Sequence, residues 1–240
     1  AAKNDRITIL EYLLENGGSS HIYTAMIYAA EFGNLYAVMF LIDNGAKLDY
    51  YSIKYYNKAM LTAVKSGQFQ VVKFFADNGA TEYNKAMVTA AGYGDINMIE
   101  LFIGKGANAY SDALIKASKH GQEETVQFFI DKGITKNYDN AMLSAIRGGN
   151  LNIVRLLGDN GANYYEEYLG EASEYGYLDI CEFLLEQGVP MTEKALPNAA
   201  RLGDLELCKF LISKGAENYG DALIPAANGG YIDVVRFLID

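Results

Sequence analysis

Glycine recurs at two fixed phases along the chain, and this rhythm constrains the fold more than any other feature. A first set lies 34, 27, 27, 28, 27, 27 and 27 residues apart: Gly33, Gly67, Gly94, Gly121, Gly149, Gly176, Gly203 and Gly230. A second glycine follows each of the first seven after 12 residues: Gly45, Gly79, Gly106, Gly133, Gly161, Gly188 and Gly215. Gly17 belongs to the second set, and Asp5 stands in its partner's place. Copies in such register indicate one structural unit repeated about eight times.

The 12-residue interval from each first glycine to its paired glycine predicts a helix. The fifth residue after the first glycine is aliphatic or Cys in every copy, and the eighth is Leu or Phe, as in Val72 and Phe75. Polar residues stand at the third, sixth and tenth positions, as in Gln70, Lys73 and Asp77. This pattern leaves a narrow polar stripe, so neighbouring units must cover the rest of the helix. The closing glycine suits a helix C-terminus, where positive φ costs Gly little.

A shorter helix with small residues is predicted before each first glycine. Ala stands four residues before the glycine in all eight copies and eight residues before it in seven, with Tyr168 as the exception. A tyrosine precedes the earlier Ala by three residues in six copies: Tyr56, Tyr83, Tyr110, Tyr138, Tyr165 and Tyr219. The residues that follow the first four, which are Asn57, Asn84, Ser111 and Asp139, are typical N-caps. The tyrosines are then interpreted as hydrophobic staples, and an aromatic binding stripe is the alternative.

Composition excludes several classes of function. The net charge of −10 without a block of like charge argues against a partner held by phosphate neutralisation, so no nucleic acid is expected. The sequence has no run of 18 apolar residues and no signal-like segment at its start, so no membrane association is expected. Two cysteines among 240 residues fit a reducing compartment. These features predict an acidic intracellular, cytoplasmic protein.

The repeated unit resembles the ankyrin repeat, with good local matches at Ala86–Ala107 and Ala195–Ala216. The resemblance covers nearly all of the chain and implies an all-α solenoid of stacked antiparallel helix pairs. Ankyrin repeats usually run to about 33 residues with a β-hairpin finger between units, whereas most units here have 27, so most fingers must be truncated. Shortened units of this kind resemble ankyrin arrays of giant amoeba-infecting viruses, which implies the cytoplasm of a host cell.

Residues 1–240 are expected to form a single array of about eight units plus a partial N-terminal unit. Fourteen residues separate Gly45 from Ala59, so a finger-like loop could survive only there. Both ends fall inside a unit, since Ala1 and Ala2 match a first-helix position and Asp240 stops before a closing glycine. We therefore expect a fragment of a longer chain.

No residues with catalytic, cofactor-binding or metal-binding spacing emerge. Cys181 and Cys208 occupy the same core position of adjacent units, where Cα atoms lie about 10 Å apart, too far for a disulfide. They are interpreted as small core residues that replace Val. His21 and His120 have no second ligand at metal-binding spacing and are interpreted as exposed turn residues. The chain is therefore expected to be no enzyme and to hold no cofactor.

Positions that vary between copies within a fixed frame are the candidates for recognition. The resemblance places them on the first helices and loops, along a concave groove. The candidate partner-binding residues are Tyr50, Tyr51, Tyr55, Thr62, Lys65, Thr89, Tyr93, Lys116, Lys119, Arg147, Glu171, Tyr175 and Arg201. Their Lys and Arg residues form a basic line that could hold an acidic partner segment, with Tyr93 and Tyr175 as aromatic anchors. A solvated helix edge, and for Tyr50–Tyr56 an ordinary junction, are the alternatives.

The function most consistent with these patterns is a non-catalytic protein–protein interaction scaffold or adaptor. A structural spacer, and a regulatory arm of a larger enzyme or ubiquitin-ligase assembly, are the alternatives. The partner is expected to be a protein, which the sequence does not identify.

The absence of polar capping units in the sequence predicts end-to-end self-association, because solenoids need caps to shield their terminal apolar faces. Light scattering of the purified chain should show a mass that rises with concentration. A constant monomer mass at high concentration would contradict this expectation.

Overall fold

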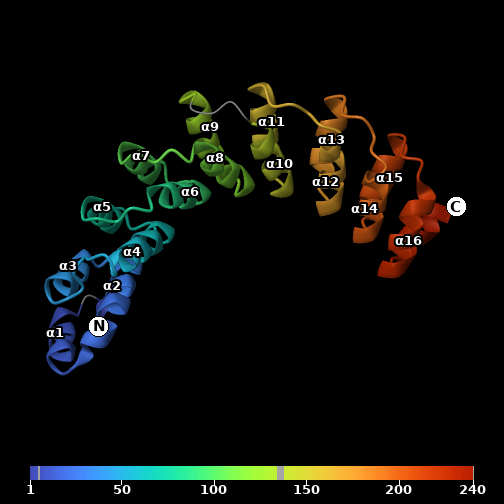
Figure 1. Cartoon of the computed structure of the whole chain (residues 1–240). Helices are drawn as coiled ribbons and strands as arrows, with labels where there is room; N and C mark the ends of the chain where they lie inside the picture. The colour runs from blue at the N-terminus through green and yellow to red at the C-terminus, as the bar shows by residue number, and fades with distance from the viewer. Residues whose placement is uncertain (5, 134–137, 240) are drawn as a thin grey trace. The chain divides into compact units, whose positions relative to one another are not determined.

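The computed structural model describes residues 1–4, 6–133 and 138–239, and the regular secondary structure among these residues is all helical, with no strand. This confirms the all-α prediction. Helices follow one another as pairs joined by tight turns (Figure 1). The chain divides into two compact units, Ala1–Lys116 and Ala117–Asp240. Their boundary falls inside helix α8 (Tyr110–Lys119).

Each repeat contributes a first and a second helix. The first helices are α2 (Ile22–Glu31), α4 (Ile53–Lys65), α6 (Tyr83–Tyr93), α8 (Tyr110–Lys119), α10 (Asp139–Arg147), α12 (Glu167–Tyr175), α14 (Ala195–Leu202) and α16 (Tyr219–Gly229). The second helices are α3 (Leu35–Asp43), α5 (Phe69–Asp77), α7 (Ile96–Gly104), α9 (Glu123–Asp131), α11 (Leu151–Asp159), α13 (Leu178–Glu186), α15 (Leu205–Ser213) and α17 (Ile232–Ile239). Before them lie α1 (Ile7–Glu15), a second helix by its position, and two short 3-10 helices, η1 (Ala2–Asn4) and η2 (Gly18–His21).

Every glycine of both sets adopts a left-handed backbone conformation, with φ between 60° and 127°. After α4, the Gln68 amide donates to the Ala63 carbonyl over 2.9 Å, and the Gly67 amide donates to the Val64 carbonyl over 3.1 Å. This pair of bonds is the Schellman arrangement that ends a helix. The bond from the residue after the first glycine back to the invariant Ala recurs in all eight copies. The interpretation of the glycines as helix terminators is therefore confirmed.

The second helices bury the residues that the pattern selected. Val72 and Phe75 have no exposed surface, whereas Lys73 and Asp77 are exposed. The fifth and eighth positions are buried in α3 through α15, and in α17 both are only half-buried. Burying one such Leu or Phe side chain contributes about 1.5–3 kcal/mol. Cys181 and Cys208 are unpaired and buried, which confirms them as core residues.

The first helices pack closely through their alanines. The Ala four residues before the glycine is fully buried in every copy. Helix α4 contacts both α2 and α6 within one unit, and α14 contacts α12 and α16 within the other. In the repeat that contains α4, the tyrosine ahead of these alanines belongs to the core. The Tyr56 ring is buried, and its hydroxyl donates to the Ala46 carbonyl over 3.0 Å.

The predicted N-caps are wrong, because Asn57, Asn84, Ser111 and Asp139 all lie inside helices. The side-chain oxygen of three of them accepts hydrogen bonds from backbone amides about one repeat later. These bonds are Thr81 N and Glu82 N to Asn57 Oδ1 (2.7 and 3.3 Å), Asn108 N and Ala109 N to Asn84 Oδ1 (2.7 and 3.1 Å), and Asn163 N to Asp139 Oδ1 (2.9 Å). The polar side chain thus holds the loop that enters the next helix pair instead of capping its own helix.

Replacing Gly67 by Ala should lower the free energy of unfolding by about 1–2 kcal/mol, the cost of left-handed backbone for a residue with a Cβ. An added Cβ at Gly67 would meet no atom within 4 Å, so the loss would report backbone strain alone. The control is Gly104→Ala at the end of α7, where φ is not positive and the space is open. It should raise the stability by about 0.5–1 kcal/mol through helix propensity. Denaturant unfolding measures both changes, and equal effects would contradict the assignment.

Candidate binding surface

The variable positions of the first unit lie on the exposed side of α4, α6 and α8. Lys65 and Lys116 are exposed, and the Tyr93 side chain is 59% exposed. Thr62 and Thr89 are half-buried, and the Thr89 hydroxyl donates to the Lys85 carbonyl of its own helix over 2.7 Å. The two threonines are therefore less exposed to solvent than the two lysines and the tyrosine of this surface.

Glycine makes room for a side chain on this surface. A Cβ at the buried Gly92 would lie 3.0 Å from Cγ of Lys116, so the Lys116 stem lies directly over α6. A long side chain that covers its neighbour in this way keeps its charged end in water. Lys116 is thus held against the helix that also carries Tyr93.

The variable positions of the second unit pair with one another. The Arg147 guanidinium donates from Nε and Nη2 to the two carboxylate oxygens of Glu171, each over 2.8 Å. This fork joins α10 to α12. The Glu171 hydrogen bonds raise the pKa of Arg147, and the same bonds lower the pKa of Glu171 below its usual 4.5. Because both side chains are partly exposed, the pair contributes less than about 1 kcal/mol to stability.

Arg201 is paired as well, so the basic line predicted for this unit is partly neutralised. Its Nη2 lies 3.4 Å from Glu174 Oε1 and 3.3 Å from Asn198 Oδ1. Glu174 and Asn198 were not among the candidate residues, although they occupy the same variable positions of their copies. Lys119 is exposed. The surface therefore presents alternating charges rather than a continuous positive line.

Apolar surface accompanies these charges. Tyr175 is 48% exposed and stacks on Tyr177 with ring centroids 6.1 Å apart, and Leu202 is 41% exposed. An exposed aromatic ring held by stacking loses little freedom when a partner covers it. Tyr175 is thus suited to act as the anchor that the sequence predicted.

Residues 46–52 do not form the β-hairpin finger that the longer spacing allowed. The Asp49 carboxylate accepts from the amides of Tyr51 and Ser52 over 2.9 and 2.8 Å, and the Ser52 hydroxyl accepts from the Asp49 amide over 2.7 Å. This reciprocal pair has the bonding pattern of a capping box, and it closes the turn that directly precedes α4, which begins at Ile53. The spacing of Asp49 and Ser52 was the signal that sequence reasoning missed. Tyr50 and Tyr51 stand exposed on this turn.

Tyr55 lies apart from that exposed pair. Its ring stacks on Tyr23 with centroids 4.5 Å apart, and the Tyr23 hydroxyl donates to the Lys47 carbonyl over 3.0 Å. The Lys54 ammonium lies 5.0 Å from the centroid of the Tyr55 ring. Tyr55 is half-buried and supports the base of the turn.

Cysteine, histidine and acidic side chains are the groups that could carry chemistry among the described residues. No group of three or more His, Cys, Asp or Glu residues within the described ranges could hold a metal ion. Burial raises the pKa of Cys181 and of Cys208 to about 11, which disfavours the nucleophilic thiolate. His21 and His120 are exposed, as predicted. Of the helices that are described, none has the length and hydropathy needed to traverse a bilayer.

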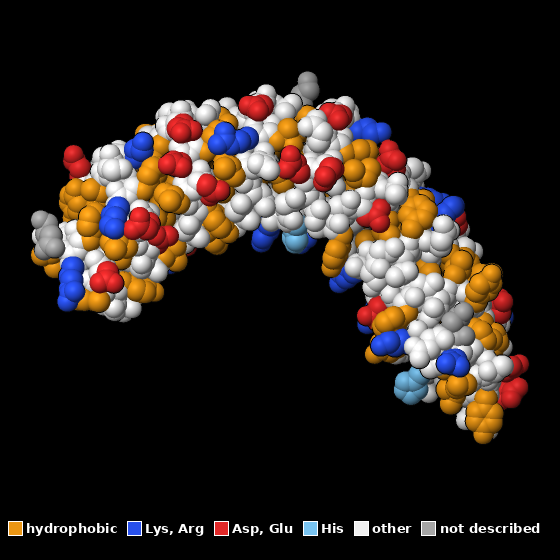
Figure 2. All heavy atoms as spheres, turned by 180° about the vertical axis from the view of Figure 1, so that it is seen from behind, with side chains coloured by type: hydrophobic (Ala, Val, Ile, Leu, Met, Phe, Trp, Pro, Cys, Tyr) orange, Lys and Arg blue, Asp and Glu red, His pale blue; other side chains and the backbone are white. Residues whose placement is uncertain are grey.

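Acidic, basic and apolar side chains are interspersed on the face seen in Figure 2, without an extended field of one sign. This agrees with the paired charges of the first helices.

A family described as ankyrin repeats (3 copies) matches residues 1–87, 86–167 and 169–240. No curated protein matches the chain significantly.

The Arg147–Glu171 fork predicts the ionisation of Glu171. Because the fork favours the carboxylate, an NMR titration should place the Glu171 midpoint below 4.5, and Arg147→Ala should raise it. The stability that the pair contributes is present above the unfolded pKa and is lost as pH falls through the folded pKa. Arg201→Ala is the control and should leave the midpoint unchanged. A midpoint insensitive to Arg147→Ala would show that the fork does not form.

Proposed function

Because the chain belongs to the ankyrin-repeat family, we propose that it is a non-catalytic scaffold or adaptor that binds a partner protein along its first helices. The observation that carries the proposal is the contrast between frame and surface. The glycines and the buried alanines recur from copy to copy, whereas the exposed positions beside them change. Packing explains the constant residues and leaves the variable ones available for recognition.

The candidate residues support this proposal in different ways. Tyr93 and Tyr175 offer exposed aromatic area, of the kind enriched among residues that dominate binding energy. Arg147 is already paired, so a partner carboxylate must share it with Glu171 or displace that residue. Such a surface selects for a partner whose charges complement the alternating pattern.

A cytoplasmic location belongs to the same proposal, and the two unpaired cysteines are compatible with it. A spacer whose length alone matters would need no particular residue at the variable positions, so substitution there separates the two roles.

Replacing Lys119, Arg147 and Arg201 together by Glu should abolish capture of a specific partner, because three charges of the surface are reversed. Pull-down from a lysate of the source cells, with mass spectrometry, compares the native chain with this variant. Lys209→Glu on α15 is the matched control, since Lys209 is exposed on a second helix, and should leave capture unchanged. Equal recovery of the same proteins by the triple variant would contradict the proposal.

A further inference from the structure

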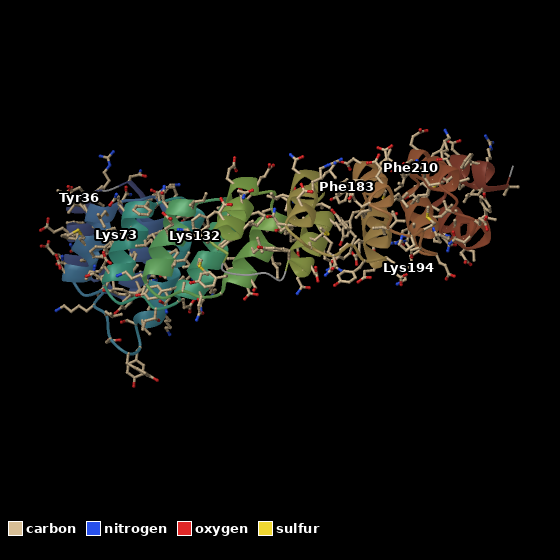
Figure 3. All side chains as sticks on the ribbon, turned by 90° about the horizontal axis from the view of Figure 1, so that it is seen from above. Tyr36, Lys73, Lys132, Phe183, Lys194 and Phe210 are labelled. Atoms are coloured by element: carbon tan, nitrogen blue, oxygen red, sulfur yellow. The ribbon has the colours of Figure 1, made fainter. Side chains whose placement is uncertain are left out.

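The connection between α3 and α4 carries an aromatic pair that the fold does not use. Tyr50 and Tyr51 are 87% and 81% exposed, and their rings meet edge to face with centroids 5.4 Å apart. In Figure 3 this connection extends farther from the helices than the later connections of the same unit. Large aromatic side chains that contribute nothing to the core are typical of contact residues for another molecule.

The tyrosines stand on a rigid base. Ser52 is 3% exposed, and its hydroxyl donates to the Lys47 carbonyl over 2.9 Å besides accepting from the Asp49 amide. The Lys47 carbonyl also accepts from the Tyr23 hydroxyl of α2. A turn fixed by this many bonds presents the rings in one arrangement, so little conformational entropy is lost on binding.

Two lysines follow the exposed tyrosines along the chain, on the first turns of α4. Lys54 and Lys58 are exposed and stand four residues apart on α4, so they share one face of the helix. Tyr50 precedes Lys54 by the same interval, and the turn that carries it already has the i-to-i+4 bond from the Ile53 amide to the Asp49 carbonyl. Neither lysine forms an ion pair with a described residue. Asp49 is the one acid in residues 47–58, and its Oδ1 accepts two backbone amides.

We propose that Tyr50, Tyr51, Lys54 and Lys58, here named the tyrosine turn, dock an acidic segment of a partner protein. Carboxylates of the segment pair with the two lysines, and its apolar atoms lie against the two rings. The inference rests on the proposed function, that the chain binds protein, and adds a second surface with a stated partner chemistry. The local excess of lysine is what favours an acidic segment, on a chain whose net charge is −10.

Single-stranded nucleic acid also combines stacking with negative charge, and is the competing occupant. The negative net charge of the chain disfavours nucleic acid, because a polyanion that extends past the turn is repelled by the acidic residues elsewhere on the chain. A short acidic segment is screened from distant charges over about 8–10 Å at physiological salt.

The test is a selection of random peptides displayed on phage against the full chain, run in parallel on the Tyr50→Ala/Tyr51→Ala variant. Peptides enriched on the native chain, whether or not the variant also enriches them, are synthesised, and their Kd values are measured by fluorescence polarisation. These peptides should carry net negative charge. They should bind the double tyrosine variant about tenfold more weakly or worse, as expected for loss of an aromatic hot spot. The variant Lys54→Ala/Lys58→Ala should also weaken binding and reduce its dependence on salt.

Tyr36→Ala is the matched control, because Tyr36 is 77% exposed on α3 outside the turn, and should leave each Kd unchanged. Circular dichroism should show equal melting temperatures, since the exposed tyrosines add nothing to the core. Selected peptides without an acidic bias, or tighter binding of a poly-dT oligonucleotide through the same residues, would overturn the inference. Peptides that respond only to the Lys119, Arg147 and Arg201 substitutions would overturn it and leave the proposed function standing. Recovery of no peptide that depends on either surface would count against both.

Discussion

The reversal of the chain at each left-handed glycine is the constraint on which the rest of this structure depends. At each glycine of the first set, the next amide donates to the carbonyl of the buried alanine of the first helix, so the first helix ends and the second begins within two residues of that glycine. The second helix is apolar on most of its circumference and is stable only when another helix pair covers it. Local backbone geometry and the burial of Val, Leu and Phe side chains therefore enforce the same repeated arrangement.

The contrast between buried constant positions and exposed variable positions limits where a partner could bind. Residues of the buried frame must stay small or apolar. Only the exposed edge of the first helices and the connections between repeats are free to change. The structure then shows how these positions differ in kind. Arg147 is tied to Glu171, so it offers a patterned charge, whereas Tyr50 and Tyr51 stand clear of the fold on a hydrogen-bonded turn. The two surfaces suit different features of a protein partner.

The helix pairs and their core could be predicted from the sequence because both follow from periodic, local patterns, such as the spacing of Gly67, Val72 and Phe75. Interactions across repeats could not be predicted in this way. Asn57 has the residue type of an N-cap, but its side-chain Oδ1 accepts hydrogen bonds from the backbone amides of the residues 24 and 25 positions later. The pairing of Arg147 with Glu171 also spans 24 residues. The sequence shows two opposite charges there but does not show that they meet. The exposure of Tyr50 depends on the Asp49–Ser52 turn, which a local motif could have revealed.

We propose that a constant, buried frame displays a variable surface to a protein partner. Hydrogen–deuterium exchange, measured on the chain alone and with a captured partner, tests this claim most directly because it reports each segment separately. Binding should slow exchange in the tyrosine turn and in first helices such as α10 and α12, and should leave exchange in the second helices α5, α11 and α13 unchanged. Slower exchange confined to those second helices would contradict it.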